Sequence, residues 1–415
     1  MKKTGFVLGL LIIPLTVTFF TSCERAKDLP DEPVPILLTE KQKEVVDQSN
    51  EFAFNIFRQI VSNKKSEGNI MISPFSISSA LSMTLNGASG ETFNEMEQAL
   101  SLNGKTIGEI NDAYLKLVSE MVPVDERVTL DVANSVWVEK TFSVKEGFLQ
   151  ALEAYFDAEA KSFDINDPVA SVEDINSWIA GKTNDKIKDM LSGLDDRTRL
   201  LLINAVYFNG KWKEKFDSGK TTDRPFHLSS GTSVNVPTMT NKITLSSFHK
   251  NSATVVDLPY GQGNYTMIIA LPDEGTTPAG LASSLDAATW QEWQASLENA
   301  GGEYQIYLPK FKYEYQRSLV TDLQNLGMKL AFTDIADFSN MADPGLKITD
   351  VLHKTFIATD EAGTEAAAAT VVIVGTTSVG PSPVIEINRP FLYFIREIYT
   401  GTIVFMGIVE DPSAS

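Results

Sequence analysis

The strongest constraint on the fold is the run from Leu200 to Phe208 (LLLINAVYF), which is apolar at nearly every position. A strand with apolar side chains on both faces is typical of a sheet that other layers cover on both sides. Asn204 is the one amide in the run, and a buried amide needs hydrogen-bond partners. The run therefore predicts a strand in the middle of a large sheet, with Asn204 hydrogen-bonded across the sheet core.

The rest of the chain alternates between helical and strand patterns. Thr39-Glu-Lys-Gln42 fits a capping box, and apolar residues at helical spacing continue to Ile60. A second amphipathic pattern predicts a helix from Asn176 to Leu191. Strand patterns are found at 129–138, 303–309, 384–387, 392–398 and 402–409, and the stretch 255–272 predicts two strands around a turn at 260–264. Because no repeat or linker interrupts residues 40–412, these elements predict one mixed α+β domain.

Composition excludes several classes of partner. The chain has 415 residues, of which 43% are hydrophobic, and a formal net charge of -19 with no concentrated Lys/Arg face. Recognition of nucleic acid or of a heparin-type polyanion requires such a face, so we expect the protein to bind neither. We also expect the protein to be a monomer. The single cysteine, Cys23, excludes an intramolecular disulfide, so the fold must depend on packing.

The N-terminus has the pattern of an export signal. Lys2 and Lys3 precede an apolar run from Phe6 to Phe20, which is shorter than the about 20 residues that a membrane-spanning helix needs. Thr21-Ser22-Cys23 follows, and a cysteine directly after small residues resembles the lipobox of bacterial lipoproteins. Phe20 departs from the aliphatic residue usual there, and the alternative is a simple cleaved signal peptide.

The lipobox interpretation predicts a signal peptide over residues 1–22, an acylated Cys23 and a proline-bearing tether over residues 23–38. The protein would be an exported lipoprotein of a Gram-negative-type bacterium, anchored at the outer membrane and facing the periplasm or the cell surface. The membrane is then a partner through the lipid anchor.

No catalytic or metal-binding pattern stands out in the sequence. The three histidines, His227, His249 and His353, are isolated, and no His, Cys or carboxylate cluster has the spacing of a metal site. Gly261-Gln-Gly263 is a turn signal that lacks the third glycine of a dinucleotide-binding loop. We expect no cofactor, no metal and no enzymatic activity, and we expect His353 to be a buried core histidine.

The stretch from Thr359 to Ser378 fits two conformations equally well. As a helix, it would have carboxylates in its first turn and the alanines Ala366 to Ala369 after them. As a strand, it would use the β-branched run from Thr370 to Val374. The ordinary interpretation is a helix that leads into a strand; the alternative is a segment that can occupy two places in the fold.

Six stretches of the chain are informative when they are taken together. They are Ile72-Ser-Pro-Phe-Ser-Ile77, Leu202-Ile-Asn-Ala-Val-Tyr-Phe-Asn-Gly-Lys-Trp212, Tyr307-Leu-Pro-Lys-Phe311, Leu326-Gly-Met328, the segment 361–370, and 387–395 running into Phe405-Met-Gly-Ile-Val409. In this order along the chain they resemble the serpin family of serine protease inhibitors, and the resemblance covers nearly all of residues 40–412. Each stretch alone is weak, but six in the family's order are specific.

The resemblance implies an α+β serpin domain over residues 39–412, with a large central mixed sheet, further sheets, a helical layer and an exposed reactive-centre loop at about 361–384. It also implies a suicide-substrate inhibitor of serine proteases. The protease cleaves the loop and forms an acyl-enzyme, and the loop then inserts into the main sheet before the ester is hydrolysed. A dozen newly paired residues at roughly 1 kcal/mol each would release on the order of 10 kcal/mol, so the uninserted form would be held kinetically.

The resemblance assigns roles to particular residues. Ser73, Ser76, Asn204 and His353 would form a polar shutter under the sheet, and Trp212 would lie at the breach where the loop enters. The hinge that leads the insertion would be Glu361, Gly363, Thr364, Glu365, Ala366, Ala367, Ala368, Ala369 and Thr370.

The reactive bond would be Thr377-Ser378. The stretch from there to Asn388 is about two residues longer than is usual, so bonds from Val374-Gly375 to Val379-Gly380 stay open. No Lys or Arg lies between Thr364 and Val384, which favours elastase-like or subtilisin-like targets over trypsin-like ones.

The hinge residues themselves fit an inserting strand, because side chains of a strand alternate between its two faces. The face that begins with Thr364 carries only uncharged residues, and Glu365, the one charge in the segment, falls on the opposite face. A shift by one residue would bury Glu365 at a cost of several kcal/mol. The alternatives are a non-inhibitory binding protein of the same fold, disfavoured by the small hinge residues, and an anchored surface hydrolase or adhesin, disfavoured by the lack of a catalytic pattern.

Overall fold

The computed structural model describes residues 32–63, 68–342, 345–364 and 382–414. The predicted signal peptide, Cys23, the hinge residues from Glu365 to Thr370 and the predicted reactive bond Thr377-Ser378 lie outside these ranges. Residues 31–415 form one compact unit.

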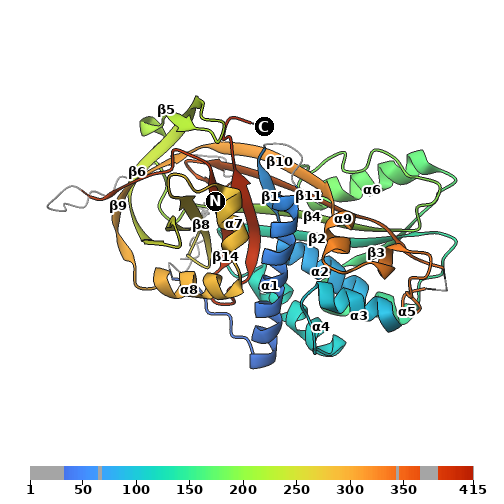
Figure 1. Cartoon of the computed structure of the whole chain (residues 1–415). Coiled ribbons are helices and arrows are strands. Elements are labelled where there is room, and N and C mark those ends of the chain that lie inside the picture. The colour runs from blue at the N-terminus through green and yellow to red at the C-terminus, as the bar shows by residue number, and fades with distance from the viewer. Residues whose placement is uncertain (1–31, 64–67, 343–344, 365–381, 415) are drawn as a thin grey trace, which may run out of the picture. The chain divides into compact units, whose positions relative to one another are not determined.

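Six strands form the sheet that contains the predicted central strand (Figure 1). In order across the sheet they are β10 (Phe311–Ser318), β11 (Ile348–Asp360), β12 (Gly363–Thr364), β4 (Leu200–Lys211), β2 (Val128–Glu139) and β3 (Glu159–Phe163). β4 pairs antiparallel with β2 and parallel with β11, so the sheet is mixed and the predicted central position of Leu200 to Phe208 is confirmed.

Two apolar layers cover the two faces of β4. Leu200, Leu202 and Val206 belong to the main core cluster, while Leu201 and Ile203 belong to a second cluster that contains residues of helix α6 (Pro168–Lys182). This alternation is what a strand that is apolar on both faces requires.

A nine-stranded sheet contributes many residues to the main core cluster. Its order is β1 (Ile70–Ile72), β15 (Ile403–Val409), β14 (Phe391–Glu397), β8 (Tyr265–Pro272), β7 (Ala253–Pro259), β6 (Ser233–Lys250), β9 (Gly301–Pro309) and β13 (Val384–Glu386), with β5 (Thr222–His227) paired to β6. β9 leads through Lys310 into β10, so one stretch of chain runs from this sheet into the six-stranded sheet (Figure 1).

The helices pack around these sheets. α1 (Glu40–Ser62) begins with the predicted capping box, in which Thr39 accepts from Gln42, and α2 (Pro74–Leu85) is buried at every position. The other α-helices of the described residues are α3 (Gly90–Ala99), α4 (Ile107–Lys116), α5 (Glu146–Phe156), α7 (Pro278–Ser284), α8 (Ala287–Leu297) and α9 (Val320–Asn325). None of the helices in the described ranges is long and apolar enough to cross a bilayer.

The predicted helix over Asn176–Leu191 is wrong in its second half. α6 ends at Lys182, and the chain then passes through Asn184 and Asp185 with φ of 49° and 61°. Short polar side chains tolerate this left-handed conformation, which ends a helix. The side chain of Asn176 instead bonds the backbone of Leu191, accepting from its N–H at 3.0 Å and donating to its carbonyl at 2.8 Å.

The described end of the predicted tether, residues 32–38, has no regular secondary structure but lies against the domain. Asn264, in the turn between β7 and β8, holds the backbone of Val34 on both sides. Its Oδ1 accepts from the Val34 N–H and its Nδ2 donates to the Val34 carbonyl, both at 2.8 Å. Ile36 is buried in the core. The chain is therefore attached to the domain before α1 begins.

Candidate functional site

β11 and β4 pair directly over only part of their length. Their parallel ladder runs from Ile348 opposite Leu200 to Thr355 opposite Val206. Beyond it the two strands part, and β12 lies between them. We call this end of the sheet the breach; in it Thr364 pairs with Thr359 on one side and with Gly210 on the other.

Gly363 is the residue with which the hinge enters the breach. Its φ is 153°, and a Cβ at this position would lie 2.1 Å from the carbonyl oxygen of Gly210 and 2.7 Å from the Cα of Lys211. Neither contact is with a flexible side chain that could move aside. The close approach of two backbones therefore requires glycine.

Thr364, the first residue of the uncharged face of the hinge, points into the protein. It is 1% exposed, and its Oγ1 lies 2.6 Å from the hydroxyl of Tyr260 and 3.3 Å from Oγ1 of Thr359. Burial raises the pKa of Tyr260 far above its ordinary value, so the phenol keeps its proton and can donate or accept. The pocket around Thr364 thus fits a small polar side chain and excludes a charge.

Glu361 lies on the outer side of the hinge. Its carboxylate accepts from Thr221 Oγ1 at 2.7 Å and pairs with Lys310 Nζ at 2.9 Å. Partial burial acts to raise the pKa of Glu361, but the Thr221 hydrogen bond and the Lys310 charge outweigh it, and the pKa is lowered overall. The hinge therefore begins at a carboxylate that stays ionised.

Trp212 lies against the turn that leads into β12. Its ring stacks on Tyr260 with centroids 4.4 Å apart and planes 9° apart. The indole Nε1 donates to the carbonyl of Asp360 at 2.9 Å, and the backbone N–H of Trp212 donates to the carbonyl of Ala362 at 3.0 Å. The structure therefore brings Trp212, Glu361, Gly363 and Thr364 together at the breach.

A second polar group lies six residues along β4 from Gly210, roughly 20 Å at the rise of a strand. His353, Asn204 and Asn134 are register partners on three adjacent strands, β11, β4 and β2. Nδ1 of His353 lies 2.5 Å from Oδ1 of Asn204, and Nδ2 of Asn204 donates to Oδ1 of Asn134 at 2.6 Å. We call this row, together with Ser73 and Ser76, the shutter.

The serines of the shutter come from the start of α2. The backbone N–H of Ser73 donates to Nε2 of His353 at 3.1 Å, and Ser73 Oγ donates to the Val404 carbonyl at 2.7 Å. Ser76 Oγ accepts from Asn204 and donates to Asn134 Oδ1. Since Nε2 of His353 is an acceptor, the proton sits on Nδ1 and the ring is neutral. Burial lowers the pKa of His353 to about 3.

Two residues of the site were not among those that the sequence singled out. Asn134 carries the same signal as Asn204, an amide inside a run with strand character, and could have been identified in the same way. Tyr260 carries no such signal, because its position beside Thr364 arises only when the turn after β7 meets β12 in the fold.

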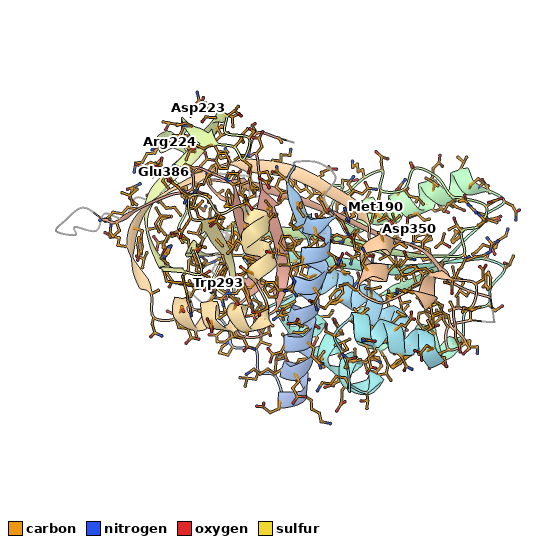
Figure 2. The ribbon with its side chains drawn as sticks, in the orientation of Figure 1. Met190, Asp223, Arg224, Trp293, Asp350 and Glu386 are labelled. Carbon is orange, nitrogen blue, oxygen red and sulfur yellow. The ribbon has the colours of Figure 1, made fainter. Side chains whose placement is uncertain are left out.

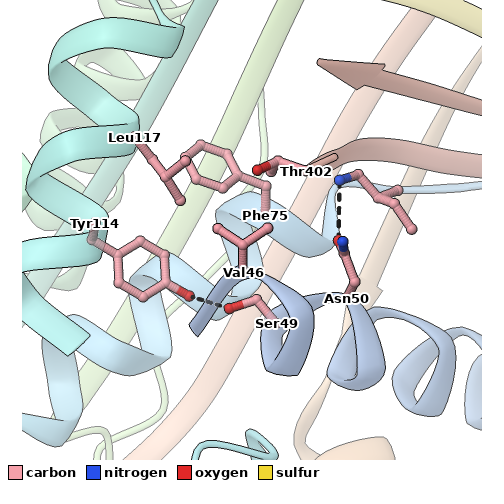
Figure 3. A pocket seen from close by; sticks show the side chains of 8 residues that line it. Val46, Ser49, Asn50, Phe75, Tyr114, Leu117 and Thr402 are labelled. Atoms are coloured by element: carbon pink, nitrogen blue, oxygen red, sulfur yellow. Dashed lines mark hydrogen bonds between the residues drawn. The ribbon is translucent and has the colours of Figure 1, made fainter. Parts of the chain in front are cut away.

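Among the described residues, neither a metal site nor a cavity for an organic ligand competes with the breach and the shutter as the functional site. They contain no group of three or more His, Cys, Asp or Glu that could hold a metal ion. A small cavity lies beside α1, lined by residues that include Val46, Ser49, Tyr114 and Thr402 (Figure 3), and it has room for about one water molecule. It is too small for an organic ligand.

Residues 47–412 match the family model described as serpin (serine protease inhibitor). Iripin-2 of Ixodes ricinus is 35% identical over 378 residues, which cover 89% of this chain and 94% of that protein. Human serpin B3 is 32% identical over 388 residues, which cover 88% and 98%.

Solved structures agree with these matches. The native state of the thermophilic serpin tengpin superposes with a TM-score of 0.82 at 30% identity, over 92% of this chain and 97% of that one. Human thyroxine-binding globulin superposes with a TM-score of 0.83 at 28% identity, over 90% of this chain and 100% of that one.

Proposed function

Because this chain belongs to the serpin family, we propose that it is a suicide-substrate inhibitor of serine proteases. A protease would cleave the segment between β12 and β13 and remain attached to it through an acyl ester. The cleaved segment would then extend β12 down the space between β11 and β4 and carry the protease with it.

The observation that carries this proposal is the position of β12. Its two residues are already paired with both strands that would have to part, and the register of Thr364 opposite Thr359 defines the path of the next residues. Continued in the same register, Ala366, Ala368 and Thr370 would come opposite Ile357, Thr355 and His353. All three inserted side chains are small and uncharged, so they could occupy the buried face that Thr364 occupies now.

The path of insertion also explains why the shutter is polar. If apolar side chains joined β11 and β4, separating the strands would cost the free energy of exposing their whole contact area. Hydrogen bonds, in contrast, can be exchanged for equivalent bonds to an incoming strand. In the proposed register, Thr370 would bring a hydroxyl next to His353 and Asn204. The shutter would then open without leaving buried polar groups unpaired.

The test is incubation with pancreatic elastase and with subtilisin, followed by denaturing electrophoresis. We expect a complex that survives SDS, release of a C-terminal peptide that begins near Ser378, and a large rise in the thermal stability of the cleaved protein. Elastase whose active-site serine is chemically blocked is the control and should give no complex. Cleavage of the loop with neither complex nor stabilisation would contradict the proposal.

A non-inhibitory binding protein is the second candidate, because the structural similarity extends equally to thyroxine-binding globulin, which has been solved in complex with thyroxine. The same experiment separates the two functions. A protein that only binds a ligand would be cleaved without trapping the protease.

We further propose that the protein is exported and anchored through an acylated Cys23. The charged, proline-bearing residues between Cys23 and Val34 would separate the anchor from the domain.

A further inference from the structure

The segment from Pro33 to Thr39, directly before α1, contains no charged residue and is only partly covered by the domain (Figure 1). Val34 is 41% exposed and Leu37 is 78% exposed. Pro35 is exposed as well, whereas Ile36 is buried in the core. Ile36 thus fixes the segment to the domain, and its neighbours present apolar side chains to the solvent.

Tyr399 extends this apolar surface. It lies in the turn between β14 and β15, is 43% exposed, and donates from its hydroxyl to the Pro33 carbonyl at 3.4 Å. The N–H of Ile398 donates to the carbonyl of Asn264 at 2.9 Å, and the side chain of Asn264 holds the backbone of Val34. The turn and the segment are therefore fixed side by side. We call Val34, Pro35, Leu37 and Tyr399 the apolar face.

The apolar face is unusual among the described residues. It contains three of their seven large hydrophobic side chains that are exposed. The other four lie one each on α4, α6, the segment that follows α9, and β13, and single exposed hydrophobic residues are normal. Aromatic side chains such as Trp293 of α8 are buried instead, here against Phe248 and Phe394 (Figure 2). The grouping therefore points to a partner.

The position of the apolar face in the chain identifies this partner. Ten residues separate Cys23 from Pro33, and they span at most roughly 33–36 Å when fully extended. A domain of this size is roughly 50 Å across. If Cys23 is acylated, the tether is too short to bring the opposite side of the domain to the bilayer. The apolar face is then the part of the domain that is always near lipid.

The chemistry of the face suits the boundary between lipid and water. Its aliphatic side chains gain free energy when they leave water, and Tyr399 combines an apolar ring with a polar hydroxyl, as tyrosines at membrane interfaces do. Two exposed carboxylates, Glu32 and Glu40, bound the uncharged segment, and the next cation, Lys41, is paired with Glu109. Anionic lipid would repel these carboxylates, so the face fits zwitterionic headgroups.

We propose that the apolar face rests on the bilayer that carries Cys23 and holds the domain against the membrane in one orientation. This inference rests on the proposed acylation of Cys23. Tethering raises the effective concentration of the face at the bilayer, so a contact that is too weak to recruit the free protein can persist in the anchored one. The protein would then meet proteases at the membrane surface and not at the end of a free tether.

The test uses the acylated full-length protein in vesicles of phosphatidylcholine. A nitroxide label is attached at Pro35→Cys, within the face, or at Ile335→Cys, where the native side chain is 76% exposed outside the face. Acylation blocks the sulfur of Cys23, the one native cysteine, so only the introduced thiol is labelled. Collision of each label with oxygen, which dissolves in lipid, is compared with collision with a water-soluble nickel chelate.

We expect the oxygen-to-nickel ratio in vesicles to be at least about threefold higher for the label at position 35 than for the label at position 335. In Cys23→Ser, which stays in solution, the two ratios should be equal. Leu37→Ser together with Tyr399→Ser should remove the difference in vesicles. Val169→Ser, which removes an exposed side chain of α6, is the matched control and should keep the difference. Thermal unfolding in solution checks that each variant is folded.

The outcomes separate the lipid contact from the anchor. An acylated protein whose two labels are equally accessible to nickel would overturn the apolar face alone. A native protein without an acyl group would overturn the proposed anchor and the face with it. A higher ratio at position 35 on phosphatidylglycerol than on phosphatidylcholine would assign the contact to basic residues and overturn the apolar face. Dimers of Cys23→Ser that dissociate on loss of Leu37 and Tyr399 would assign the face to a second copy of the chain.

Discussion

The hydroxyl of Tyr260 and Oγ1 of Thr364 lie 2.6 Å apart in the breach. The first inward side chain of the hinge is thus already hydrogen-bonded within the domain. Any residue at position 364 must fit a closed, uncharged space next to a phenol that burial keeps neutral.

Thr364→Arg is expected to convert the inhibitor into a substrate. A guanidinium at this position would be buried without a counter-charge, at a cost of several kcal/mol, so the hinge would stay out of the sheet while the loop could still be cleaved. Thr364→Val is the matched control, because it keeps the shape and loses only the hydrogen bond. Counting moles of inhibitor consumed per mole of elastase measures the effect. Covalent complex formation by the arginine variant at the native ratio would disprove the insertion argument.

Gly363→Ala is expected to displace β12 from the breach. The new methyl carbon would lie 2.1 Å from the Gly210 carbonyl oxygen, and the backbones would have to separate. We expect a loss of stability of at least about 1 kcal/mol and a higher proportion of cleaved, uncomplexed protein. Gly147→Ala, in the first turn of α5 with no atom within 4 Å of the new Cβ, controls for the substitution itself. Equal effects of the two changes would rule out the close approach as the cause.

His353 is expected to make the fold sensitive to acid. Its pKa is about 3 in the fold and about 6.5 in the unfolded chain, so between these values the unfolded state binds one more proton. The free energy of unfolding should therefore fall as the pH drops from 6.5 towards 3, by about 2 kcal/mol or slightly more between pH 7 and 4.5. Urea denaturation at both pH values measures this change.

The matched variant is His353→Gln, which cannot titrate. It should be less stable than the native sequence at neutral pH, because the bonds to Ser73 and Asn204 are disturbed, but its stability should depend less on pH over this range. The same pH dependence in both proteins would assign the acid sensitivity to other groups.

Cys23→Ser is expected to release the protein from the membrane fraction. The thiol is the only group in the chain that a lipoprotein acyl transfer could use, because the sequence contains one cysteine. Metabolic labelling with a radioactive fatty acid, with fractionation of the cells, measures both outcomes. An unlabelled native protein in the soluble fraction would support the simple signal peptide instead.

The sequence predicted those features whose cause is local. The run Leu200 to Phe208 is apolar on both faces, which suits only a central strand of a sheet that is covered on both sides. The strand lies at that predicted position. The capping box at Thr39 was equally clear, because both of its hydrogen bonds lie within four residues. The α+β fold and the family followed from short stretches in a shared order.

What the sequence missed depends on contacts between distant segments. Ile187 and Leu191 continue the helical spacing of α6, yet they pack as part of an irregular segment, because the helix ends at the left-handed residues Asn184 and Asp185. Asn176 then bonds the backbone of Leu191. The contact of Tyr260 with Thr364 joins residues 104 positions apart. Arg224 of β5 likewise bonds Glu386 of β13, although the order of these strands in the sheet is not visible in the sequence.

The attachment of Val34 to Asn264 has a mechanical consequence. A pull on the chain ahead of α1 reaches these two hydrogen bonds, and a 3.4 Å bond from the Tyr399 hydroxyl to the Pro33 carbonyl, before it reaches the helix. The turn that contains Asn264 also bonds Lys211, since the N–H of Gly261 donates to the Lys211 carbonyl at 2.7 Å. Lys211 is the strand partner of Gly363. Tension on the N-terminal end of the chain is therefore transmitted through one turn to the strand that borders the hinge.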